Sequence, residues 1–188
     1  MRRPTSISRT RPSAGRLSEE SMHMITLDSP RPSFARVLVP VWLVTAACDA
    51  VCATSLSVFV YGGRAAGVWQ GVASTVLGPA AIGGGAKMVA AGLALHALVA
   101  LTWSAIFVAA LWLWPALQRA IRAPGTAAAV ASAYGPVIWL VMSLAVIPLA
   151  TGRPPRIAGR WWVQLFAHIP FVTLPLVFTA RRFTKGQS

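Results

Sequence analysis

The stretch MVAAGLALHALVALTWSAIFVAALWLW, residues 88–114, decides the fold because it runs for 27 residues without an acidic or basic side chain other than one histidine. A helix needs about 20 mostly apolar residues to cross roughly 30 Å of hydrocarbon. Three further stretches of the same character lie at residues 37–61, 125–150 and 161–180. The sequence therefore predicts four transmembrane helices, which occupy more than half of the 188 residues.

The composition supports a membrane protein, since 56% of the residues are hydrophobic and only 11% are charged. The apolar residues run continuously and do not alternate, which excludes a transmembrane barrel. The predicted fold class is all-α, a transmembrane bundle of four spanning helices that covers residues 36–182. No stretch is left for a separate folded soluble domain.

The segment between the first two spans, residues 62–87, has helical features of its own. Five apolar side chains recur at helical spacing between Gly-rich ends: Val68, Trp69, Val72, Val76 and Leu77. This pattern predicts a short interfacial or re-entrant helix within residues 65–82. The alternative is a fifth span, which would place the two termini on opposite sides of the membrane.

The net charge of +13 comes from basic residues in the loops and tails rather than on one folded face, which argues against a nucleic-acid partner. Twelve basic residues lie in the amino tail, the second loop and the carboxyl tail, against five in the first and third loops. The positive-inside rule then places both termini in the cytoplasm. The five basic residues on the other side of the membrane are Arg64, Lys87, Arg153, Arg156 and Arg160.

The amino tail, residues 1–35, is rich in Ser, Arg and Pro and poor in large apolar side chains, which predicts a disordered, basic cytoplasmic segment. Residues 183–188 form a short second cytoplasmic tail. Translation from Met22 or Met24 is an alternative start. The first span is interpreted as an uncleaved anchor, and the rival is a lipoprotein signal processed before Cys48.

Three ionisable side chains lie inside the predicted spans: Asp49, His96 and His168. Such groups cost at least a few kcal/mol in hydrocarbon, so we expect them to face the bundle interior and to have partners. At about 1.5 Å per residue, both histidines lie roughly 12 Å from the same end of the bundle, and Asp49 lies about one turn deeper. The sequence therefore predicts a buried cluster of the three, with an Asp–His contact.

Three roles are open to this cluster. The side chains can simply hydrogen-bond across helices and specify their packing, or a carboxylate beside an imidazole can take up and release a proton. The third role is a metal or haem site at His96 and His168, with Asp49 and with Cys48, Cys52 and Met142 as further candidate ligands. The cysteines have a competing interpretation as small buried apolar side chains.

No catalytic motif is present, because the sequence contains neither HExxH nor CxxC, and Gly83–Gly85 is not followed by a phosphate-loop signature. The leading interpretation is a non-enzymatic, multi-pass inner-membrane protein with no resident cofactor, whose partners are the lipid bilayer and a second copy of the chain. The alternatives are a small transporter and a haem- or metal-binding redox subunit.

Four strings also carry a resemblance: ASTVLGPAAIGGG, GLALHALVALTWSAIFV, YGPVIWLVMSLAVIPL and HIPFVTLPLVF. Together they resemble a family of small bacterial multi-pass membrane proteins to which no activity is attached. The resemblance covers residues 40–182 and implies a bacterial protein. It is carried by His96, Tyr134, Met142, Pro148 and His168, whereas Ser143 stands where relatives often have Asn.

Overall fold

The computed structural model describes residues 32–184 and contains no strand in that range. The first long helix is α2 (Phe34–Ser55), which continues into a π-helical turn (Leu56–Val60). The helix begins at Phe34 because the hydroxyl of Ser33 accepts a hydrogen bond from the Arg36 amide. Residues 1–31 and 185–188, which hold most of the two predicted tails, lie outside the described residues.

The later helices follow the predicted order. A short helix α3 (Ala65–Leu77) precedes the long α4 (Gly85–Leu113) and the short α5 (Pro115–Ala120). The third span consists of α6 (Pro124–Val141), a π-helical turn (Met142–Val146) and α7 (Ile147–Thr151). The fourth consists of α8 (Gly159–His168), a π-helical turn (Ile169–Thr173) and α9 (Leu174–Arg181).

Four helical runs in residues 32–184 are long and apolar enough to cross a membrane: Phe34–Val60, Gly85–Leu113, Pro124–Thr151 and Gly159–Arg181. Each matches a predicted span to within a few residues, so the predicted all-α bundle is confirmed. The short helix predicted between the first two spans is also present. With 13 residues, α3 is too short to be a fifth span.

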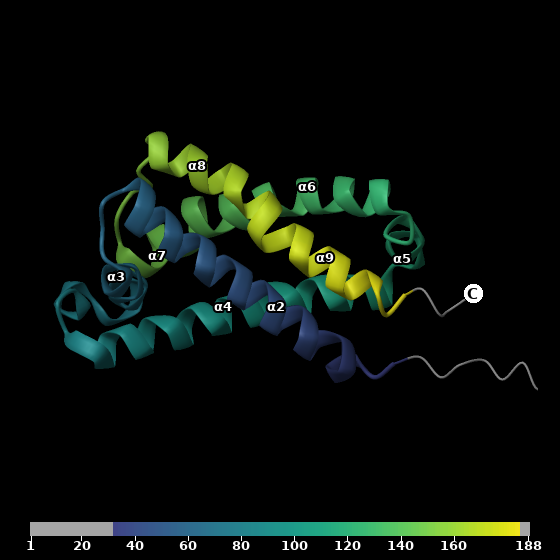
Figure 1. Cartoon of the computed structure of the whole chain (residues 1–188), viewed down its shortest axis with the longest axis horizontal. Coiled ribbons are helices and arrows are strands. Elements are labelled where there is room, and N and C mark those ends of the chain that lie inside the picture. Colours follow the sequence, from purple (N-terminus) through teal and green to yellow (C-terminus); the bar gives the residue numbers. More distant parts are fainter. Residues whose placement is uncertain (1–31, 185–188) are drawn as a thin grey trace, which may run out of the picture. The chain divides into compact units, whose positions relative to one another are not determined.

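Contacts between the ends of the long helices fix their directions. At one end, the Phe34 ring at the start of α2 lies 5.7 Å from the Trp112 ring near the end of α4. At the same end, the guanidinium of Arg181 donates to the carbonyl of Arg122. At the other end, the Arg160 guanidinium lies 4.3 Å from the centre of the Tyr61 ring. Consecutive spans are therefore antiparallel (Figure 1).

The tightest packing lies towards the end where α2 begins and α9 finishes. Side chains from α2, α4, α6 and α9 form one buried cluster there, together with Ile121 from the second loop. Its members are Val37, Val41, Phe107, Val108, Leu111, Ile121, Ala127, Ala131, Leu176, Val177 and Ala180. At the opposite end a cavity lies between the third and fourth spans.

Two glycines allow close approach of backbones, as small residues commonly do between membrane helices. A Cβ atom at Gly92 in α4 would collide with the carbonyl oxygen of Trp69 in α3. A Cβ atom at Gly135 in α6 would lie 2.9 Å from the hydroxyl of Thr173 and 3.1 Å from the backbone of His168. These contacts hold α3 against α4, and α6 against the fourth span.

Candidate functional site: the Asp49–His96 pair and the basic cavity

Asp49 on α2 and His96 on α4 face each other. The Nδ1 atom of His96 lies 3.8 Å from Oδ2 of Asp49, and the side chains of His96 and Asp49 are 14% and 27% exposed, respectively. Asp49 is the only acidic side chain in residues 32–184, so no other carboxylate competes for His96 there. The Asp–His contact predicted from the sequence is present, although the pair is only partly buried.

Two reciprocal hydrogen bonds position this pair. The Nε2 atom of His96 on α4 lies 3.2 Å from the carbonyl oxygen of Ala46 on α2. In the opposite direction, the indole Nε1 of Trp42 on α2 donates to the carbonyl oxygen of Ala97 on α4, at 2.8 Å. Each helix therefore supplies one side-chain donor to the backbone of the other, which fixes their register beside Asp49.

The short helix α3 covers the histidine. The Trp69 ring lies 5.3 Å from the His96 ring in an edge-to-face arrangement, and Trp69 is itself buried. The contact depends on Gly92, one turn before His96, because the backbone of Trp69 occupies the place of a side chain there. His96 is thus held by groups from α2, α3 and α4.

This arrangement has a chemical consequence for protons. A carbonyl oxygen only accepts, so the contact with Ala46 requires the proton of a neutral His96 ring to lie on Nε2. Nδ1 is then an acceptor, and it faces an ionised carboxylate that is also an acceptor. The 3.8 Å separation is longer than a hydrogen bond but within the range of an ion pair, which requires a protonated ring.

His168 has partners of its own, so the predicted buried cluster of three is corrected to a pair. Its Nδ1 atom lies 2.7 Å from the carbonyl oxygen of Gln164 in its own helix. Its ring packs at 5.0 Å from the Trp139 ring of α6. The predicted depths did not determine the direction in which each helix turns its side chains, and α8 turns His168 towards α6.

The candidate metal ligands are likewise not assembled. No group of three His, Cys, Asp or Glu side chains within residues 32–184 is arranged to hold a metal ion. Cys48 and Cys52 are both free thiols on α2, and Met142 begins the π-helical turn of the third span. The histidines considered as a haem pair lie among different neighbours, His96 beside Trp69 and His168 beside Trp139.

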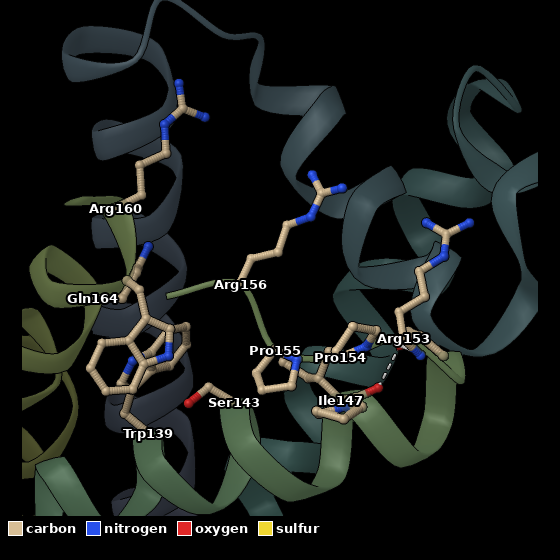
Figure 2. Close-up of a pocket in the computed structure, with 12 residues that line it drawn as sticks. Trp139, Ser143, Ile147, Arg153, Pro154, Pro155, Arg156, Arg160 and Gln164 are labelled. Atoms are coloured by element: carbon tan, nitrogen blue, oxygen red, sulfur yellow. Dashed lines mark hydrogen bonds between the residues drawn. The ribbon is translucent and has the colours of Figure 1, made fainter. Parts of the chain in front are cut away.

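A second candidate site is a cavity of about 570 Å³ between the third and fourth spans. Its wall includes Trp139 from α6, Ser143 from the adjoining π-helical turn, Ile147 from α7 and Trp161 from α8. Three arginines also line it: Arg153, Arg156 and Arg160. In Figure 2 their side chains extend to the side of the cavity away from Trp139 and Ser143.

The wall of this cavity contains polar atoms without partners. The hydroxyl of Ser143 and the indole N–H groups of Trp139 and Trp161 are buried and make no hydrogen bond within residues 32–184. Ser143 is 7% exposed and Trp161 is 9% exposed. An unsatisfied buried polar group costs about 1–3 kcal/mol.

Sequence reasoning counted the three arginines for topology alone and did not predict the cavity. The run Arg153-Pro154-Pro155-Arg156 could have indicated an anion site, because the prolines restrict the backbone between two cations. Trp139 and Ser143 carry no such signal, since only the packing of the third span against the fourth brings them beside this loop.

The four long apolar helices define the class of the molecule, an all-α multi-pass membrane protein. Comparisons with protein-family models, curated proteins and solved structures gave no match to this chain.

Proposed function

We propose that this chain is a non-enzymatic, multi-pass protein of a bacterial inner membrane in which Asp49 and His96 form a one-proton site between the first two spans. The 3.8 Å separation of Nδ1 and Oδ2 carries the proposal, together with the carbonyl of Ala46 that directs the other ring nitrogen. Proton binding at this site strengthens the contact between α2 and α4, so packing and proton handling share the same residues.

The surroundings support a proton site more than a permanently charged one. Asp49 is the only acidic side chain of residues 32–184 and lies inside a span, where an isolated charge costs at least a few kcal/mol. A proton shared with His96 lowers this cost.

The test is nitrogen NMR of the full chain in detergent, with ¹⁵N-labelled histidine and His96→Ala to assign the signals. We expect Nε2 of His96 to stay protonated while Nδ1 gains and loses a proton as the pH changes, and Asp49→Asn to alter the Nδ1 signal alone. An unprotonated Nε2, or a His96 spectrum unaffected by Asp49→Asn, would contradict the proposal. His168 is the internal control, because its ring contacts Gln164 and Trp139 rather than a carboxylate.

We also propose that both termini lie in the cytoplasm. The basic residues of the sequence support this orientation, with twelve on the side of the termini and five on the other. The antiparallel spans are consistent with it, since an even number of crossings returns the chain to the side on which it began.

A further inference from the structure

The cavity between the third and fourth spans has cations without anionic partners. Arg153, Arg156 and Arg160 are all exposed, and the only acidic side chain of residues 32–184, Asp49, lies beside His96. Arg160 contacts the face of the Tyr61 ring. No carboxylate in the described part of the chain therefore neutralises these three charges, and an external anion can do so.

The rest of the cavity selects the kind of anion. Trp139, Ile147 and Trp161 present apolar surface, which favours a hydrocarbon group over a small hydrated ion. The unpartnered hydroxyl of Ser143 points towards Trp139 in Figure 2, on the opposite side of the cavity from the guanidinium groups. The site thus combines a cationic rim with an apolar wall.

The position of the cavity along the spans matches a lipid. It lies where the span Pro124–Thr151 ends and the span Gly159–Arg181 begins, which is the level of the head groups in a bilayer. Tryptophans also prefer this depth.

We propose that this cavity binds one anionic phospholipid, with its phosphate at Arg153 and Arg156 and one acyl chain against Trp139 and Trp161. Guanidinium groups bind phosphate oxygens through paired, charge-assisted hydrogen bonds. The proposal is independent of the Asp49–His96 site, which lies on other helices.

The test is native mass spectrometry of the full chain in detergent with phosphatidylglycerol or phosphatidylcholine of the same acyl chains. We expect one phosphatidylglycerol to bind at least about tenfold more tightly than phosphatidylcholine, a difference of about 1.4 kcal/mol. Arg153→Gln with Arg156→Gln should remove most of this preference. The matched control is Arg64→Gln with Lys87→Gln, which removes the same charge at the same end of the bundle but outside the cavity. This control should leave the preference for phosphatidylglycerol within about twofold of the unchanged protein.

Two further arms separate the lipid from other anions. Ser143→Leu fills the cavity at constant charge and should weaken phosphatidylglycerol binding. Glycerol phosphate, which has the phosphate without acyl chains, should not displace the lipid at equal concentration. Displacement by glycerol phosphate, no preference for phosphatidylglycerol, or equal losses in the two double variants would each overturn the proposal.

Discussion

The Nδ1 atom of His96 lies 3.8 Å from the Oδ2 atom of Asp49, across the interface of the first two spans. The contact joins the only acidic side chain of residues 32–184 to a histidine whose other nitrogen already faces the carbonyl of Ala46. It therefore links two helices, and it is the site to which the proposed function assigns one proton.

The energy of this link is measurable by a double-mutant cycle. At a pH at which the pair holds its proton, we expect Asp49→Asn to lower the free energy of unfolding by about 1 kcal/mol, because the amide keeps the shape but loses the charge. In an Asp49→Asn, His96→Ala protein the losses should be less than additive, with a coupling energy of about 1 kcal/mol. Denaturant unfolding in detergent gives the free energy of unfolding of the unchanged protein, the two single variants and the double variant. Additive losses would show that the two side chains do not interact.

The contact of α3 with α4 predicts opposite effects for two glycine substitutions. Gly92→Ala places a methyl group against the carbonyl of Trp69, so the helices must separate, at a cost of about 1–3 kcal/mol. Gly71→Ala is the matched control, since nothing lies within 4 Å of its added Cβ. Alanine there should stabilise α3 by about 0.5–1 kcal/mol. Thermal unfolding shows whether each variant is less or more stable than the unchanged protein. Equal effects of the two substitutions would contradict the close approach of Gly92 to Trp69.

A buried threonine links the third and fourth spans. Thr173 is fully buried, and its hydroxyl donates to the carbonyl oxygen of Ala131 at 2.7 Å. Thr173→Val should cost about 1 kcal/mol, because valine has the same shape without the donor. The control is Thr102→Val, whose exposed hydroxyl bonds to Leu98 in its own helix. We expect that change to stay within about 0.5 kcal/mol. Comparable losses of stability in the two variants would contradict an interhelical role for the Thr173 hydroxyl.

The spans were predictable from the sequence because a bilayer requires every backbone group within it to be paired, and a long apolar run then has to be helical. The depths of Asp49 and His96 followed from the same regular rise, and their contact is present. The direction of His168 did not follow, because the rotation of a helix is set by its packing partners. Here Trp139 of α6 is the partner of the His168 ring.

The cavity was not predictable for a related reason. Its wall joins Trp139, Ser143 and Trp161, which belong to a helix, a π-helical turn and a second helix separated by a loop. Sequence spacing predicts which residues share a face of one helix, whereas this site depends on how two spans pack against each other. The sequence contains the arginines, but only the structure shows that all three line the same cavity.

The proposed orientation of the bundle rests on the basic residues of the amino tail. Residues 32–184 carry five basic side chains at each end of the bundle, so the bias comes from the tail residues and Lys185. In the full chain, a reporter fused after Ser188 should be active only in the cytoplasm. A chain that begins at Met22 keeps seven basic residues on that side and should keep the orientation. Changing Arg31 and Arg36 of this shorter chain to Gln leaves five on each side and should give both orientations. Paired cytoplasmic and periplasmic reporters measure the ratio, and a periplasmic carboxyl end in the full chain would contradict the proposed topology.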